Sequence, residues 1–177
     1  MSPSEHTRPG TQRACCRAVC ESVAELFPWL PWAHAGYSMA DAMEWARSRA
    51  QLLAERREFA FAIVDPDGLF LGGCGINQLN PIQQFGNLGY WVRTSATGRG
   101  VASEAVRQLA DFAFRNTDLV RLEIVCAAGN QRSQRVAERA GAVREGVLRH
   151  RLLLHGQAVD AIMYSLIRPV ACCRSRG

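Results

Sequence analysis

A glycine-rich stretch, "TSATGRGVASEA" at residues 94–105, contains the residue types that most clearly suggest chemistry in this chain. Two glycines flank an arginine there, after an apolar segment and before a helix-like pattern. Glycine lets a ligand approach the backbone closely, and the first amides of a helix, aided by its dipole, bind phosphate groups. The stretch therefore predicts a phosphate-binding loop with contacts from Gly98, Arg99, Gly100, Val101 and Ala102.

Two common phosphate-binding loops fit this stretch poorly. The nucleotide-triphosphate loop requires G-K-[ST] after its last glycine, whereas "VA" follows Gly100 here. The dinucleotide fingerprint G-x-G-x-x-G is nearly met by "GRGVAS", and Glu123 stands where its ribose-binding acid would. However, "RTSAT" separates the strand from the first glycine, and Ser103 replaces the third small residue. A dinucleotide-dependent oxidoreductase is therefore disfavoured.

A second motif lies in "LEIVCAAGNQRSQRVAERAGAVREGVLR", residues 122–149. It contains Asn130-x-x-Ser133, with Gly141 eleven residues after the asparagine. Together with the glycine loop, "LGYWVR" before it and "LFPWLPWAH" at residues 26–34, this motif resembles the GCN5-related N-acetyltransferase (GNAT) superfamily. Gly100 and Ala102 match the last two positions of that superfamily's Arg/Gln-x-x-Gly-x-Gly/Ala signature. The resemblance is closest to the RimJ/RimL branch, which acetylates N-termini of ribosomal proteins.

The resemblance implies an α/β (α+β) fold with a mixed central sheet and about four flanking helices. The sheet would splay into a V between the fourth and fifth strands of the family, which correspond to "LGYWVR" and "RLEIVCAA" here. Residues 1–177 would form one domain, with the resemblance running over about 29–167 and flexible tails at 1–14 and 169–177. The N-terminal segment shows no candidate for the strand that usually opens the fold.

The resemblance also implies acetyl-coenzyme A as co-substrate, no metal, and direct attack of an amine on the thioester. The pantetheine arm would lie in the V and pair with free backbone groups near Trp91 and Val92, as an added strand does. Asn130 would cap the helix that follows it and contact the pantetheine. Catalysis would depend on positioning, a backbone donor for the oxyanion and a route for protons.

Ser133 is the residue that the RimJ/RimL branch would use to protonate the departing thiolate, since the tyrosine position of many relatives is Ala137 here. The alternative is a serine that only begins a helix. The base is less clear, because two glutamate positions of relatives correspond to Asn87 and Leu152. Asn87 would hold a water through which the proton leaves. Glu145, His150 and His34 are further candidates.

Thr97 departs from the family at the leading position of the glycine signature, which removes one side chain that faces the phosphates. Arginines could compensate, or could simply form a solvated face. The candidates are Arg99, Arg132, Arg135 and Arg139. For Cys126, on the strand that lines the cleft, inert burial is favoured over a nucleophilic role.

The acceptor side of the cleft would involve Trp29, Trp32 and Tyr90, which could equally be core aromatics. The expected acceptor is a protein N-terminal α-amine, with a ribosomal protein as one partner. A small-molecule amine is the alternative acceptor, and a coenzyme A-binding module without turnover is the alternative function. The net charge of +5 also allows an RNA or ribosome-surface binder, although no aromatic platform accompanies the arginines. A homodimer is compatible with the resemblance.

The elements that would position these residues follow from hydrophobic periodicity. Helices are expected at residues 18–27 and from Ser38 to 57, where Met39, Met43, Ala46, Ala50 and Leu53 form the expected apolar stripe. Strands are expected at 58–65, 69–79, 85–93 and 120–128, and a last pair at 142–154 and 158–167. Helices at 100–116 and 130–141 flank the strand at 120–128.

Composition agrees with one compact domain, since 48% of the 177 residues are hydrophobic. Of the seven cysteines, five cluster near the chain ends and lack zinc-site spacing, so reduced thiols are expected. No apolar run is long enough for a membrane span, and the N-terminus lacks the apolar core of a signal peptide. These features predict a cytoplasmic protein.

Overall fold

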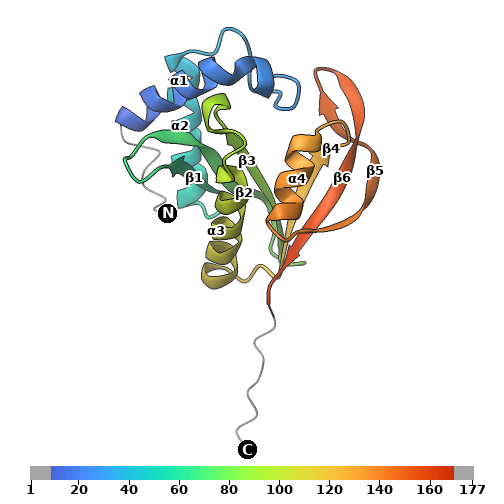
Figure 1. Cartoon of the computed structure of the whole chain (residues 1–177). Coiled ribbons are helices and arrows are strands. Elements are labelled where there is room, and N and C mark those ends of the chain that lie inside the picture. Colours follow the sequence, from blue (N-terminus) through green and yellow to red (C-terminus); the bar gives the residue numbers. More distant parts are fainter. Residues whose placement is uncertain (1–8, 170–177) are drawn as a thin grey trace, which may run out of the picture.

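The computed structural model describes residues 9–169 of the chain. Two helices, α1 (Pro9–Leu26) and α2 (Met39–Ala54), precede the first strand (Figure 1). The remaining elements follow in the order β1 (Phe59–Val64), β2 (Phe70–Asn80), β3 (Phe85–Val92), a 3-10 turn (Thr94–Ala96), α3 (Val101–Asn116), β4 (Arg121–Ala127), α4 (Gln131–Arg139), β5 (Val143–Leu154) and β6 (Gln157–Ile167). The predicted order of helices and strands is confirmed.

The six strands form one mixed sheet in the order β1-β2-β3-β4-β6-β5. Strands β3 and β4 are parallel and pair only at Phe85 with Arg121, Gly86 with Leu122 and Asn87 with Glu123. Beyond these pairs the two strands diverge, so that the sheet opens into the V visible in Figure 1. The predicted splay is confirmed. It lies between the third and fourth strands here, because the described part of the chain begins with a helix and contains no earlier strand.

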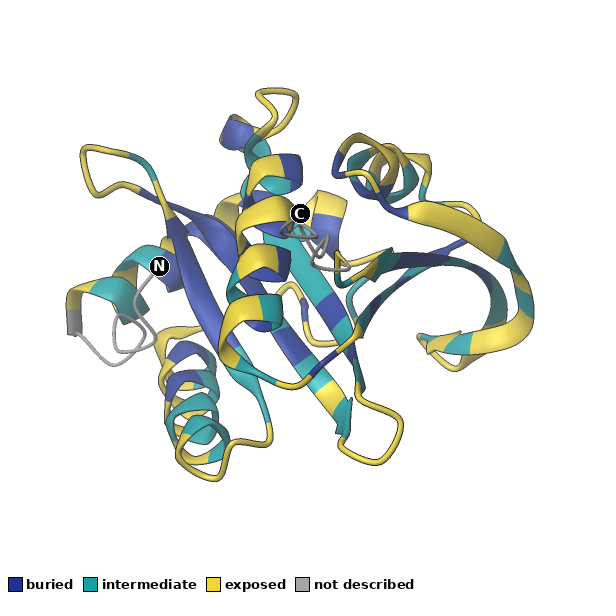
Figure 2. Ribbon diagram, turned by 90° about the horizontal axis from the view of Figure 1, so that it is seen from below, coloured by how far each residue is buried: buried dark blue, intermediate teal, exposed yellow. Residues whose placement is uncertain are grey.

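The helices cover the two faces of the sheet unequally. On one face, α3 and α4 pack over a core that includes Val106, Leu109, Leu122 and Ile124. On the other face, α1 packs with Cys15, Ala18 and Val19 against Ala62 and Phe70 of the first strands. Figure 2 shows that β2 is mainly buried and that β3 and β4 are buried or half-buried, whereas the edge strand β5 is largely exposed. The half of the sheet that ends in β5 is therefore less covered by helices than the half that contains β1 and β2.

The first helix begins at Pro9, nine residues before the predicted start. Proline is well suited to the first turn of a helix, and the buried Cys15 continues the apolar face of Ala18 and Val19 back toward the N-terminus. The expectation of a flexible tail over residues 1–14 is therefore wrong for residues 9–14. Residues 1–8 and 170–177, with Cys172 and Cys173, lie outside the described residues.

The second helix begins as predicted, and the face that it buries overlaps the predicted stripe in part, since Ala46 is buried. Ser38 donates its backbone N–H and its hydroxyl to the Asp41 carboxylate, at 2.8 and 2.7 Å, which closes the helix start. The expected apolar stripe is wrong at Met39 and Met43, which are both exposed. The buried residues of α2 are the alanines at 42 and 46, because small side chains allow the close approach of α1.

None of the described helices is long and apolar enough to cross a membrane.

A substitution at the base of the V tests how tightly the two halves are joined there. A Cβ at Gly86 would lie 2.8 Å from Ile76 Cγ2 and 2.9 Å from Leu79 Cδ2, whereas a Cβ at Gly89 would meet nothing within 4 Å. We expect Gly86→Ala to lower the free energy of unfolding by about 1–3 kcal/mol, because overpacking displaces a fully buried isoleucine. Gly89→Ala is the control in the same strand and should leave the melting temperature nearly unchanged. Equal melting temperatures for both variants would contradict this packing.

Candidate active site

The glycine loop connects β3 to α3 and has the conformation expected of an anion-binding loop. Gly98 and Gly100 both have positive φ, 76° and 80°, and Gly100 is the residue immediately before α3. A side chain at either position would be strained, because L-residues rarely adopt this region. The first amides of α3 have no partner within the helix, and the helix dipole favours negative charge there. The geometry of the loop from Gly98 to Ala102 is therefore compatible with the predicted phosphate contacts.

Thr97, the departure from the family signature, uses its hydroxyl within the chain segment that precedes the glycines. Its hydroxyl donates to the backbone oxygen of Thr94 at 2.8 Å, within the 3-10 turn that precedes the glycines. Arg99, Arg132, Arg135 and Arg139 are all exposed, which fits either of the roles foreseen for them. Arg107 donates to the backbone oxygen of Arg139 at 3.0 Å and so joins α3 to the end of α4.

The inner edges of the V offer backbone groups to an extended ligand. The N–H of Arg93 donates to the oxygen of Leu71 in β2 at 2.8 Å. Neighbouring residues of a strand direct their backbone N–H and C=O groups to opposite edges of the strand. The N–H and C=O of Val92 therefore point away from β2 and toward β4, from which β3 has separated. This geometry supports the predicted pantetheine contact at Val92. The backbone of Trp91 is directed toward β2 instead, so any contact there would involve its side chain.

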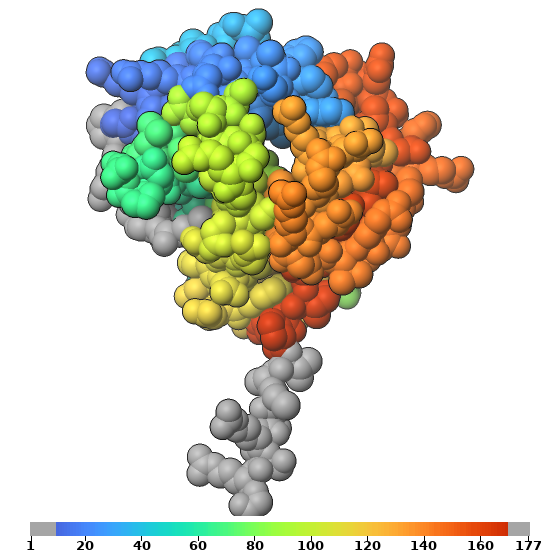
Figure 3. Space-filling view, in the orientation of Figure 1, coloured from blue at the N-terminus to red at the C-terminus, as the bar shows by residue number. Residues whose placement is uncertain are grey.

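The space between the strands is visible from outside. Figure 3 shows an opening through the molecule between three segments: the one that follows β3, the connection from α1 to α2, and the one that begins α4. A donor and an acceptor could therefore enter the V from different sides.

Ser133 lies on the β4 side of the V, in the first turn of α4. The side-chain oxygen of Asn130 accepts a hydrogen bond from the backbone N–H of Ser133 at 3.1 Å, which confirms the predicted cap. The Ser133 hydroxyl lies 2.9 Å from the Tyr90 hydroxyl and 3.2 Å from the Cys126 sulfur. Tyr90 also donates to the Ser133 backbone oxygen at 2.9 Å. The hydroxyl of Ser133 is thus held by both walls of the V.

Burial keeps the two neighbours of Ser133 uncharged. Desolvation is the main cause that raises the pKa of the Cys126 thiol and that of the Tyr90 phenol. Both groups therefore stay protonated near neutral pH, which agrees with inert burial of Cys126. Tyr90 was expected on the acceptor side, but strand alternation places it on the α3 and α4 face, opposite to Asn87 and Trp91. Its contact with Ser133 was missed, because the two residues are 43 positions apart.

Asn87 faces the other side of the sheet, toward α1 and α2, at the last paired position before the strands diverge. Its amide nitrogen donates to the side-chain oxygen of Asn77 at 2.8 Å, so its own oxygen is left to accept a hydrogen bond. Asn77 is the neighbour of Asn87 across β2 and β3, a pairing that sequence patterns did not reveal. This arrangement suits the predicted role of Asn87 in holding a water.

The carboxylates near Asn87 are engaged in ion pairs. Glu123, which pairs with Asn87 across the V base, accepts from Arg121 at 2.9 Å, and Arg121 also binds Glu145 at 2.6 Å. Hydrogen bonds from Arg121 and then Ser165 lower the pKa of Glu145 to about 2, so Glu145 is a poor base at neutral pH. Leu152 lies in β5 opposite Val159 and brings no carboxylate to the cleft.

The two histidines proposed as bases have other partners. His34 lies 3.7 Å from Asp41 at the start of α2. The backbone N–H of His150 donates to Asp160 at 2.9 Å, beside a cavity of about 470 Å³ that Arg149, His150 and Asp160 line. Neither contact places an imidazole at Asn87 or Ser133. Among the described residues, no group of three or more acidic, cysteine or histidine residues could hold a metal.

The connection between α1 and α2 reaches both walls of the V. On the β4 side, a Cβ at Gly129 would lie 3.4 Å from the Trp29 ring, and Phe27 stacks on His155 with ring centroids 4.0 Å apart. On the β3 side, the Trp32 and Trp91 rings meet edge to face at 5.7 Å. Trp29 and Trp32 therefore lie at the face of the cleft where Asn87 is. The part played by Phe27 and His155 was not foreseen.

Residues 13–143 match a sequence family described as an acetyltransferase (GNAT) domain, which covers well over half of the chain. The ribosomal-protein-serine acetyltransferase of Escherichia coli (strain K12) is 27% identical over 149 residues, which cover 84% of this chain and 83% of that protein. YdaF of Bacillus subtilis (strain 168), a candidate ribosomal N-acetyltransferase, is 33% identical over 102 residues. That match covers 58% of this chain and just 56% of YdaF.

Solved structures agree with these sequence matches. One is RimL, described as a ribosomal L7/L12 alpha-N-protein acetyltransferase, in complex with coenzyme A through a disulfide to a cysteine. It has a TM-score of 0.83 and 25% identity, and the match covers 91% of this chain and 90% of RimL. The splayed sheet, the glycine loop and the capped serine helix are thus parts of a known architecture. This chain belongs to the GNAT family, in its RimJ/RimL-type branch, and is an acetyl-coenzyme A-dependent acetyltransferase that acts on an amine.

Proposed function

We propose that this enzyme acetylates the N-terminal α-amine of a protein in the cytoplasm, with a ribosomal protein as the candidate acceptor. The observation that carries the proposal is the absence of a free carboxylate beside Asn87 among the described residues, since Glu123 and Glu145 both bind Arg121. An α-amine has a pKa of about 7.7–8.0, against about 10.4 for a lysine side chain. At neutral pH its neutral fraction is roughly a few hundred times larger, so it needs less help from a base.

Two further observations support a protein terminus as acceptor. The relatives with ribosomal-protein names point to this class. Gly89, between Asn87 and Trp91 on the acceptor face of β3, borders open space, because a Cβ there would meet nothing within 4 Å. An extended chain end could enter along this strip, under Trp29 and Trp32.

The residues on the two walls would divide the work of the transfer. The separated edge of β3 at Val92 and the amides from Gly98 to Ala102 bind the donor. Asn87 orients the amine or its water through its free amide oxygen. A C–N bond then forms and the C–S bond breaks, while Ser133, oriented by its contact with Tyr90, gives its proton to the departing thiolate and recovers one from solvent. The amine loses its proton to water at Asn87.

The acceptor class is tested by incubating the enzyme with acetyl-coenzyme A and measuring free thiol. We expect thiol release with short peptides that carry a free N-terminal serine or alanine, and none with the same peptides when the N-terminus is already acetylated. A peptide with a blocked N-terminus and one lysine is the matched control. Release with spermidine or the lysine control, but not with free N-termini, would replace the proposal by a small-amine or side-chain acceptor. No release with any amine would favour a coenzyme A-binding module.

Ser133→Ala tests the proton donor. The cap of α4 uses the backbone N–H of Ser133, so the substitution leaves the helix start intact. We expect kcat to fall by about 10²-fold or more, the usual effect of losing a general acid, while the KM for acetyl-coenzyme A stays nearly constant. Cys126→Ala is the matched control, because it removes the other neighbour of the same hydroxyl and should change kcat little. An unchanged kcat for Ser133→Ala would remove the serine from the mechanism.

The pH profile of kcat/KM tests the role of Asn87. We expect activity to rise with pH and level off near the acceptor pKa of about 7.7–8.0, because the neutral α-amine is the reactive form. Asn87→Ala should lower the plateau by roughly tenfold without moving the inflection, since an amide does not titrate. An inflection near 10 would indicate a lysine or polyamine acceptor, and one that moves when Asn87 is replaced would contradict this role.

A further inference from the structure

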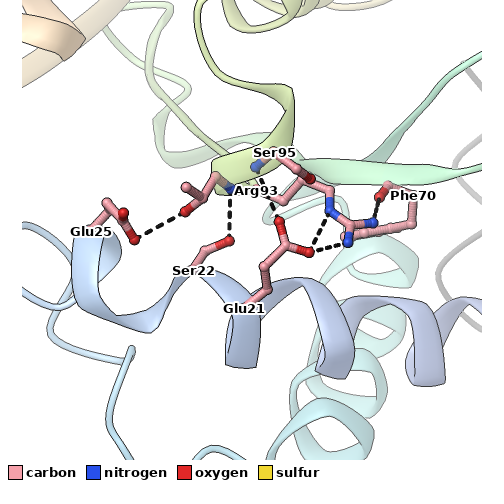
Figure 4. Close-up of polar contacts among 7 residues, drawn as sticks. Glu21, Ser22, Glu25, Phe70, Arg93 and Ser95 are labelled. Carbon is pink, nitrogen blue, oxygen red and sulfur yellow. Dashed lines mark hydrogen bonds and ion pairs between the residues drawn. The ribbon is translucent and has the colours of Figure 1, made fainter.

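The side of α1 that faces the glycine loop carries three polar residues, Glu21, Ser22 and Glu25. They lie within reach of the segment that leaves β3, although the two segments are about 70 positions apart in sequence (Figure 4). Glu21, Ser22 and Glu25 take no part in the acetyl transfer described above. The contacts of Glu21 and Ser22 with backbone amides explain how the start of the glycine loop is held.

Side chains of α1 bind two successive backbone amides of this segment. One Glu21 oxygen accepts from the Ser95 N–H at 3.0 Å, and the Ser22 hydroxyl accepts from the Thr94 N–H at 2.9 Å. Ser22 is fully buried, so this hydrogen bond is shielded from water. Glu25 accepts only from the Thr94 side chain, at 3.0 Å.

Arg93 joins the same contacts to the sheet. Its guanidinium donates twice to the second Glu21 oxygen, once at 3.1 Å through Nε and once through Nη2. It also donates to the backbone oxygen of Phe70 at 3.2 Å. Hydrogen bonds from Arg93 and then Ser95 lower the pKa of Glu21 to about 2, so the carboxylate stays charged throughout the working pH range. Helix α1, strand β2 and the start of the loop thus meet at one ion pair.

Backbone hydrogen bonds hold this segment as far as Thr97, the residue immediately before Gly98. The Ala96 N–H donates to the Arg93 oxygen at 3.0 Å, and the Thr97 N–H to the Thr94 oxygen at 3.1 Å. Ala96 is buried, whereas residues 97–100 are exposed. The flexible glycines therefore lie between a segment fixed by α1 and the start of α3, and the place of their amides depends on both.

We propose that Glu21 is a positioning residue for the pyrophosphate of acetyl-coenzyme A. Through Arg93 and the amide of Ser95, it fixes the direction in which the chain leaves β3, so that the amides from Gly98 to Ala102 converge on one anion. Preorganised donors bind better than mobile ones, because less conformational entropy is lost on binding. The inference rests on coenzyme A binding and is independent of which amine is acetylated.

The experiment compares two acetyl donors, acetyl-coenzyme A and S-acetylpantetheine, which lacks the pyrophosphate and the nucleotide. For Glu21→Gln, we expect the KM for acetyl-coenzyme A and the Kd for coenzyme A in calorimetry to rise about tenfold, with kcat changed less than about twofold. The kcat/KM for S-acetylpantetheine should stay the same. Glu25→Gln is the matched control on the same helix and should leave the constants for both donors unchanged.

Glu21→Asp provides a second variant should Glu21→Gln fail to fold. It keeps the charge but is one methylene shorter, so it cannot reach Arg93 and Ser95 together, and the same selective loss is expected. Equal losses for both donors would show a structural role only and would overturn the proposal, as would unchanged binding of coenzyme A in a folded variant. Failure of the unsubstituted enzyme to bind coenzyme A would instead refute donor binding itself, and that result would be seen before any variant is compared.

Discussion

The parallel pairing of β3 with β4 stops after three residue pairs, and the cleft exists because it stops there. Backbone groups that leave a ladder need other partners when they are not in water. The edge of β3 at Val92 and the facing edge of β4 therefore form a place where an extended amide chain can complete both strands. On the α3 and α4 face, side chains from both halves of the sheet, including Leu88 of β3 and Ile124 of β4, are buried in one core.

Each wall of the V is then fixed by contacts of its own. On the β3 wall, an ion pair between α1 and Arg93 holds the segment that leads into the glycine loop. On the β4 wall, the cap at Asn130 starts α4 and presents Ser133 to Tyr90 across the gap. The connection from α1 to α2 contacts both walls through Trp29 and Trp32. In the proposed mechanism, donor binding, proton donation and acceptor entry thus come from three separate parts of the chain that meet at one gap.

Much of this arrangement could be predicted, because it depends on short-range patterns. Hydrophobic periodicity located the four α-helices and six strands of the described residues, α1 in its second half, and the glycine spacing located the loop whose φ angles at Gly98 and Gly100 are positive. The Asn130 cap is a local contact over three residues, and it was also predicted. The start of α1 was missed because its first turns are polar, and only packing against β1 and β2 makes Cys15 part of a buried face.

What could not be predicted depends on contacts between distant residues. The side of the sheet on which Tyr90 lies, the partner of Asn87 in β2 and the contacts of Glu21 with Arg93 and Ser95 all require the register of the folded sheet. The exposure of Met39 and Met43 has the same origin, because α1 selects the alanine face of α2. Patterns of residue type predict which face of a helix or strand is apolar. Which distant residue a side chain contacts depends on how all the elements pack in the folded chain.

Everything proposed for this enzyme depends on donor binding between the separated strands, with the pyrophosphate at the glycine loop. A crystal structure of the enzyme with coenzyme A tests it most directly. We expect pantetheine amides paired with the backbone at Val92, the pyrophosphate on the amides from Gly98 to Ala102, and the sulfur within reach of the Ser133 hydroxyl. Coenzyme A bound outside the V, or phosphates held by side chains alone with the loop amides turned away, would contradict it.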